Sequence, residues 1–176
     1  MVPVVEESGL AGYSHVILPV LGAELAVPDA LAAKRSPNRL ATEDGSASVE
    51  FTELPPARTL SELFAEATHD KPAPGRSVTY KKLKDDWFVV SGRAGAAIYY
   101  EKTARLGERN LRFTFQFPAA QKKEFDEDTA YMASSFRALG APEPELPKGR
   151  CRTDGECPKG YHCPPSGFCT INWGDE

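Results

Sequence analysis

The strictest hydrophobic pattern in the chain is an alternation of apolar and polar residues over positions 111–117. The apolar positions are Leu111, Phe113, Phe115 and Phe117, and the polar positions between them are Arg112, Thr114 and Gln116. Because successive side chains of a β-strand point to opposite faces of its sheet, this pattern predicts a strand whose phenylalanine face packs on the core.

Three earlier segments, 78–83, 87–92 and 97–102, also have β character and are separated by short turns. We expect these turns at 85–86 and at 92–95. Short connections require consecutive strands to pair in antiparallel fashion, so the pattern predicts one continuous antiparallel sheet. Segment 87–92 is largely apolar, which indicates that both of its faces are covered.

The N-terminal part of the chain has a weaker β pattern. Residues 15–21 and 22–28 predict the two halves of a hairpin. Residues 29–40 are expected to be irregular, because Pro28 precedes them and Pro37 and Asn38 lie within them. After a turn at Asp44–Gly45, residues 46–54 alternate and predict a further strand.

Two segments predict helices. Thr59 followed by Glu62 three positions later is a capping-box pattern. The apolar residues at helical spacing after it are Leu60, Leu63, Phe64 and Ala67. Residues 119–139 predict a second helix that ends at Gly140. Its apolar face comprises Phe125, Thr129, Met132, Phe136 and Leu139, at the steps of three and four that a docked helix requires.

These elements predict an α+β fold in which an antiparallel sheet of about five or six strands is packed by two helices. A small disulfide-rich module follows it. The expected division of the chain is an N-terminal tail 1–12, the α+β domain 13–140, a Pro-rich linker 141–150, a disulfide module 151–169 and a final tail 170–176. Residues 151–169 are called the tail module below.

All four cysteines of the chain lie in the tail module, at Cys151, Cys157, Cys163 and Cys169, each six residues after the one before. Structural zinc sites usually pair their ligands about two to four residues apart, so this spacing favours two disulfides over a metal site. Three pairings are possible. We favour Cys151–Cys163 with Cys157–Cys169, because interleaved bridges restrain such a short segment most.

Disulfides persist in oxidising compartments, so the cysteines favour a secreted, periplasmic or cell-envelope protein over a reduced cytosolic one. The first residues lack the basic start and long apolar stretch of a signal peptide. We therefore expect that a signal sequence was removed and that Met1 was added for expression. The chain has no run of about 20 apolar residues, so we expect no transmembrane helix.

The formal net charge of −4 does not indicate nucleic-acid or membrane binding. Residues 71–112 nevertheless carry ten basic residues against four acidic ones. The candidate binding residues are Lys81, Lys82, Lys84, Arg93, Lys102 and Arg112 in this region, with Tyr161 and Phe168 in the tail module. The alternative is that the basic residues form a solvated strand face. The aromatic residues of the sheet are expected in the core, although Tyr80 and Tyr100 would also suit an open groove.

We find no catalytic frame in the sequence. The three histidines are scattered at His15, His69 and His162, without the spacing of a metal or triad motif. Ser91 precedes a glycine but lacks the preceding glycine of a nucleophile elbow. All four cysteines are expected in disulfides, which leaves no thiol nucleophile. We therefore predict no catalytic residue, no metal and no cofactor.

The region 77–139 resembles the PsbP-like domains of secreted bacterial proteins of unknown function. The matching stretches are Asp86-Trp-Phe-Val-Val-Ser-Gly92, Tyr99-Tyr-Glu-Lys102, Phe117-Pro118 and Ser135-Phe136, and the turn at Asp44–Gly45 fits the same pattern. The resemblance implies an antiparallel sheet flanked by helices. It also implies a binding or assembly role without a catalytic motif.

The tail module is similar to segments of Dickkopf-type and whey-acidic-type cysteine motifs, with an acidic residue before the second cysteine and Cys157-Pro-Lys-Gly-Tyr-His-Cys163 after it. Here it is shortened to four cysteines.

The sequence thus predicts an exported, non-enzymatic binding or assembly protein, envelope-associated or derived from a lipoprotein, that acts through its α+β domain. The expected partner is a protein or an anionic envelope surface, and not a nucleic acid. One alternative is a secreted inhibitor or ligand that acts through the loops of the tail module, with Tyr161 or Phe168 as an anchor. A second alternative is an enzyme with a dispersed site.

Overall fold

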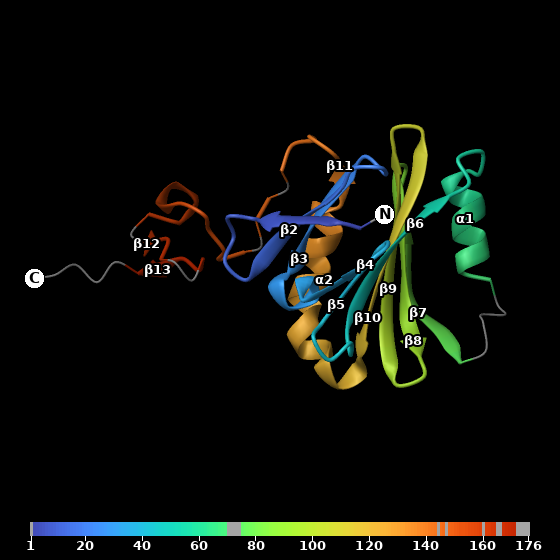
Figure 1. Cartoon of the computed structure of the whole chain (residues 1–176), viewed down its shortest axis with the longest axis horizontal. Helices are drawn as coiled ribbons and strands as arrows, with labels where there is room; N and C mark the ends of the chain where they lie inside the picture. The colour runs from blue at the N-terminus through green and yellow to red at the C-terminus, as the bar shows by residue number, and fades with distance from the viewer. Residues whose placement is uncertain are drawn as a thin grey trace, which may run out of the picture.

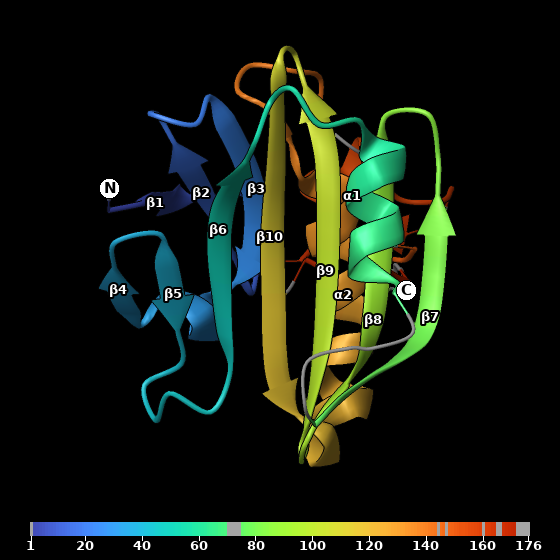
Figure 2. The ribbon, with the colours of Figure 1, turned by 90° about the vertical axis from the view of Figure 1, so that its right-hand side faces the viewer.

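The computed structural model describes residues 2–69, 75–143, 145–146, 148–159, 161–164 and 167–171. The chain has an α+β fold, as predicted, in which helices α1 (Leu60–Ala67) and α2 (Lys122–Ser135) pack on opposite faces of a seven-stranded antiparallel sheet (Figures 1 and 2). The strand order of this sheet is β4–β5–β6–β10–β9–β8–β7. Its strands are β4 (Lys34–Ser36), β5 (Arg39–Ala41), β6 (Ser48–Leu54), β7 (Arg76–Leu83), β8 (Trp87–Ala94), β9 (Ala97–Leu106) and β10 (Arg109–Pro118).

A smaller, four-stranded sheet has the order β1–β2–β3–β11. Its strands are β1 (Val4–Glu7), β2 (Tyr13–Leu18), β3 (Ala23–Pro28) and β11 (Arg137–Ala138). The prediction of about five or six strands was therefore too low for the described part of the chain. Among the strands that the sequence did not reveal, β4, β5 and β11 have only two or three residues each, too few to produce an alternation, and β4 and β11 lie at sheet edges.

The main core lies between the large sheet on one side and α2 with the small sheet on the other. The predicted phenylalanine face of β10 is buried there, which confirms the interpretation of its alternation. Phe113 meets Phe136 edge-to-face with a centroid distance of 5.2 Å, and Phe115 meets Phe125 in the same way at 5.3 Å. Aromatic pairs of this kind stabilise a core beyond the area that they bury.

Helix α1 covers a second cluster on the opposite face of the sheet. The predicted capping box is present, because the Thr59 side chain accepts from the Glu62 amide at 3.2 Å and the Glu62 carboxylate accepts from the Thr59 amide at 2.8 Å. Leu63 is buried, and Phe64 packs edge-to-face on Phe88 at a centroid distance of 5.5 Å. Both faces of β8 are thus covered at its apolar positions, as its composition indicates.

Three local predictions were wrong. Helix α2 ends at Ser135 and not at 139, because Arg137 and Ala138 leave the helix to pair with β3. The Arg137 side chain there forms an ion pair of 2.8 Å with Glu24, which is almost fully buried. Gly92 lies inside β8, and the turn falls at residues 95 and 96 instead. Residues 29–40 are not irregular: they contain the short helix η1 (Asp29–Ala32) and the hairpin of β4 and β5.

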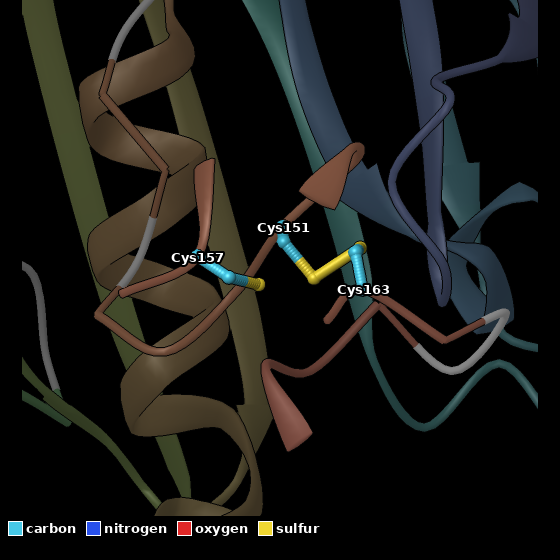
Figure 3. Close-up of side chains that lie close together, drawn as sticks. All are labelled: Cys151, Cys157 and Cys163. Carbon is cyan, nitrogen blue, oxygen red and sulfur yellow. A yellow bond between two sulfur atoms is a disulfide. The ribbon is translucent and has the colours of Figure 1, made fainter. Parts of the chain in front are cut away.

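The disulfide pairing Cys151–Cys163 with Cys157–Cys169 is confirmed. Figure 3 shows the first of these bridges. The tail module contains the short helix η3 (Asp154–Glu156) and strand β12 (Tyr161–His162), which pairs in antiparallel fashion with β13 (Thr170–Ile171) directly after the module. A further short helix, η2 (Ala119–Gln121), precedes α2.

The last linker residue, Arg150, connects the tail module to the residues around the start of β2. The Arg150 guanidinium lies 3.7 Å from the centre of the Phe168 ring and 5.5 Å from that of Tyr13, and it donates to the Ala11 carbonyl at 3.3 Å. Arg152 forms an ion pair of 2.7 Å with Glu143. These contacts fix the beginning of the tail module against the loop that precedes β2.

Candidate binding surface on strands β7 to β9

Strands β7, β8 and β9 carry exposed and half-exposed side chains on the face of the large sheet that α2 partly covers. Helix α2 packs on β3, β9 and β10. Farther along the sheet, strands β8 and β7 carry exposed or half-exposed side chains on the same face. We define the β7–β9 surface by its polar and aromatic members: Tyr80, Lys82, Trp87, Ser91, Arg93, Tyr100 and Lys102.

The strand register determines which side chains share this face. Lys82 pairs with Val89, and Val89 pairs with Lys102 on the next strand. One step along, Tyr80 pairs with Ser91 and Ser91 with Tyr100. Side chains at paired positions project from the same face of an antiparallel sheet, so they form two rows across β7, β8 and β9.

Trp87 lies beside the first row, two residues before Val89 on the same face of β8. The ammonium nitrogens of Lys102 and Lys82 lie 5.3 Å and 5.9 Å from the centre of its ring. Both distances fall within the range of a cation–π contact. The Trp87 ring is only partly buried, and its inner part packs on the main core. A rigid strand therefore presents an indole ring with two lysines around it.

Lys102 is fixed in place, whereas Lys82 is exposed. The Lys102 ammonium donates to the carbonyl of Ala133, in α2, at 2.5 Å. Burial lowers the pKa of Lys102, and the nearby Asp86 carboxylate opposes this effect. Lys102 therefore connects α2 to the sheet at the border of the β7–β9 surface, and Lys82 extends the positive charge toward solvent.

The second row adds two tyrosines. Tyr80 is 50% exposed. Tyr100 stacks on Phe113 with a centroid distance of 6.1 Å, and burial together with Tyr80 raises the pKa of Tyr100 to about 12. Both tyrosines can contribute apolar contact and hydroxyl hydrogen bonds to a partner, as tyrosines at interfaces commonly do.

The β7–β9 surface carries no acidic side chain from its own strands. Glu101 is the one carboxylate within β7, β8 and β9, and it faces α1 on the opposite side, where it bonds to Arg76 at 2.9 Å. The cations Lys82, Arg93 and Lys102 thus face one direction without a carboxylate on the same strands. Such a distribution favours contact with an acidic surface.

The candidate basic residues of the sequence divide between the two faces of the sheet. Lys82, Arg93 and Lys102 lie on the β7–β9 surface. Lys81 pairs with Val90 and Arg112 pairs with Thr103, which places both on the α1 face. Lys84 follows β7 at the turn to β8. Period-two alternation sends neighbouring lysines to opposite faces, so one cluster in the sequence becomes two in the structure.

The candidate residues of the tail module lie far from this surface, at the opposite end of the molecule (Figure 1). Tyr161 is 38% exposed and Phe168 is 45% exposed. Phe168 is already stacked under Arg150. Sequence reasoning placed Trp87 in the core and missed its position between two lysines. The sequence could have revealed this arrangement. A turn after residue 84 folds the next strand back along the first, which brings Lys82 next to residues 87 and 89.

The described part of the chain offers one group of residues with metal-ligand spacing. The sulfurs of Cys151, Cys157 and Cys163 lie within 4.8 Å of one another (Figure 3). Each of these cysteines is in a disulfide, which removes the thiolate that a metal would require. His15, the first of the scattered histidines, contacts Glu24 at 3.2 Å beside Arg137 and belongs to the small sheet.

No helix in the part of the chain that the structure describes is long and apolar enough to cross a membrane.

The order of the strands and the positions of the two helices define a PsbP-like fold. The chain is similar to the solution structure of cyanobacterial PsbP (CyanoP) from Synechocystis sp. PCC 6803, with a TM-score of 0.53 and 13% sequence identity over 75% of this chain and 95% of that chain. No family model matches the sequence, and no curated protein matches it. The similarity therefore concerns the fold, and it confirms the PsbP-like resemblance of the sequence at that level.

Proposed function

We propose that the chain is an exported, non-enzymatic binding or assembly protein that contacts an acidic partner protein through the β7–β9 surface. The observation that carries the proposal is the cluster of Lys82, Trp87 and Lys102, in which the two ammonium groups lie 5.9 Å and 5.3 Å from the centre of the indole ring. The two disulfides support an oxidising compartment.

The chemistry of this surface suits a protein interface. Binding energy at interfaces is concentrated in tryptophan, tyrosine and arginine side chains, which combine large contact area with polar groups. Trp87, Tyr80 and Arg93 are of these types, and they project from strands rather than from loops. Rigid strands hold such side chains in place before binding, so less conformational entropy is lost on association.

The charge pattern favours an acidic protein over a lipid surface. Recognition of anionic lipids usually requires about four to eight clustered basic residues. The β7–β9 surface has Lys82, Arg93 and a half-buried Lys102, and the whole chain has a net charge of −4. A local positive face on an acidic protein would orient a complementary partner and accelerate association.

The test compares capture of partners from the cells that produce the protein by the wild type and by Lys82→Glu/Arg93→Glu. Lys123→Glu, at an exposed position on α2, changes charge elsewhere on the surface and is the matched control. We expect an acidic protein that is retained by the wild type and by the control and is lost with the double variant. Its retention should also decrease as salt is raised, because exposed charges are screened.

Equal retention by the double variant and the wild type would overturn the proposal. Loss with Tyr161→Ala/Phe168→Ala but not with the β7–β9 variant would assign binding to the tail module instead. Sedimentation with vesicles of anionic phospholipid, without a retained protein, would assign the surface to a membrane and would also contradict the proposal.

A further inference from the structure

A hollow lies on the opposite face of the sheet from the β7–β9 surface, beneath α1. It has a volume of about 340 Å³, which is within the range of small-molecule sites. The α1 wall includes Leu63 and Ala67, and the sheet provides Val78, Tyr99, Glu101 and Arg112. This hollow, called the α1 pocket below, is separated from the β7–β9 surface by the thickness of the sheet.

Three arginines and two glutamates line the α1 pocket. Arg58 pairs with Glu66 at 3.1 Å. Arg76 pairs with Glu101 at 2.9 Å, and its guanidinium lies 3.8 Å from the centre of the Tyr99 ring. Two of the three guanidinium groups therefore already have a carboxylate.

Arg112 differs from the other two arginines. Its Nε donates to the Thr103 hydroxyl at 3.0 Å, which holds the guanidinium in one orientation. Among the described residues, no carboxylate lies within the 4.0 Å limit of an ion pair with Arg112, although the group is half-buried. A half-buried guanidinium without a carboxylate is an electrostatic site for an anion, because its two terminal nitrogens form a fork that matches the two oxygens of a carboxylate.

The rest of the pocket selects the kind of anion. Glu101 is only 6% exposed, and its negative charge beside the pocket disfavours a ligand with two charges. With three arginines against two glutamates, one negative charge on the ligand gives local neutrality. Leu54, Ala67 and Val78, which are partly exposed, offer apolar surface to the body of the ligand.

We propose that the α1 pocket binds a small monocarboxylic acid with an apolar body, whose carboxylate takes the place of the missing partner of Arg112. The Thr103 hydroxyl holds the guanidinium from behind, and the fixed Arg76–Glu101 pair closes one side of the site. The proposal does not depend on the β7–β9 surface, which is on the other face of the sheet.

The experiment is a titration of the isotope-labelled full chain with sodium benzoate, followed by NMR signals of the backbone amides and of the arginine Nε–H groups. Benzamide has the same shape without the charge, and inorganic phosphate carries more charge without the apolar ring. We expect benzoate to shift the signals of Arg112, Tyr99 and Leu63 at millimolar concentrations. Benzamide and phosphate should leave them nearly unchanged.

Arg112→Gln keeps a hydrogen-bonding side chain beside Thr103 but removes the charge, and it should weaken benzoate binding about tenfold or more, as for loss of a charged hydrogen bond. Arg93→Gln, on the other face of the sheet, is the matched control and should bind benzoate like the wild type. The dispersion of the same spectra reports whether each variant is folded.

The proposal is overturned if benzoate leaves the pocket signals of the folded wild type unchanged, or if benzamide shifts them equally. It is also overturned if phosphate binds more tightly than benzoate, or if folded Arg112→Gln binds benzoate as well as the wild type. None of these results affects the proposed protein interface, whose test uses Lys82 and Arg93 and a different readout.

Discussion

Replacing Gly92 with alanine tests how closely β7 and β8 pack beneath the two candidate sites. Gly92 pairs with Val78, next to an irregularity in which the register shifts between Val78 and Tyr80. A Cβ atom at position 92 would lie 1.7 Å from the Ser77 carbonyl oxygen and 2.8 Å from the Ser77 carbonyl carbon. Glycine is therefore required here by the close approach of the neighbouring backbone.

The magnitude follows from that distance. Carbon and oxygen atoms in a close contact between strands are about 3.3 Å or more apart, so the backbone at Ser77 would have to move by roughly 1.5 Å. The neighbouring atoms are backbone, which cannot rotate away as a side chain can. Overpacking of this kind costs about 1–3 kcal/mol, and each ladder hydrogen bond that breaks adds about 1 kcal/mol. We expect Gly92→Ala to lose about 3 kcal/mol of unfolding free energy.

Urea denaturation followed by circular dichroism measures this loss. With a slope of about 2 kcal/mol/M, the midpoint should fall by roughly 1.5 M. Gly155→Ala is the matched control, because the nearest atom to its added Cβ would be the Thr153 hydroxyl oxygen at 3.9 Å. Since β7 carries Lys82, the Gly92 variant should also weaken capture of the partner. A Gly92→Ala midpoint within the error of the wild type would refute the packing argument.

Hydrogen bonds from Thr42 and Ser46 lower the pKa of Asp44 to about 2. The stability that this ionised carboxylate contributes is therefore complete above the unfolded pKa of 3.8 and is lost as the pH falls toward 2. The stability difference between the wild type and Asp44→Asn should therefore shrink from pH 5 to about pH 2 in urea titrations. A difference that stays constant over this range would contradict the assignment. In a second test, reduction of both disulfides should accelerate tryptic cleavage after Arg150 about tenfold or more, because the closed loops restrain the segment that stacks Phe168 on this arginine. Equal cleavage rates in the oxidised and reduced protein would show that the domain contacts alone hold Arg150.

Local features of the fold followed from the sequence where the pattern itself fixes the geometry. The alternation at 111–117 determined which face of β10 is buried, because side chains of a strand alternate regardless of what covers them. Thr59 and Glu62 defined the start of α1, since a capping box involves only neighbouring residues. The shortness of the cysteine segment favoured the interleaved pairing among the three possible ones, and the structure confirms it.

Other local features depended on tertiary contacts, which the hydrophobic pattern of the sequence does not encode. Helix α2 stops at Ser135 because β3, more than 100 residues earlier, offers an edge to Arg137 and Ala138. The sequence predicts a turn at Gly92, yet this residue lies inside β8, where the Ser77 backbone approaches it closely. In each case a distant segment, and not the neighbouring residues, sets the local structure.

The candidate sites show the same division. The sequence by itself determined that residues 71–112 are rich in basic side chains and that alternate positions face opposite ways. Only the tertiary structure decided which faces remain accessible: α2 leaves Lys82 and Trp87 on one side, and α1 encloses Arg112 on the other. The physical reason is that side-chain direction is a property of the local backbone, whereas exposure and ion pairing depend on which elements pack across each face.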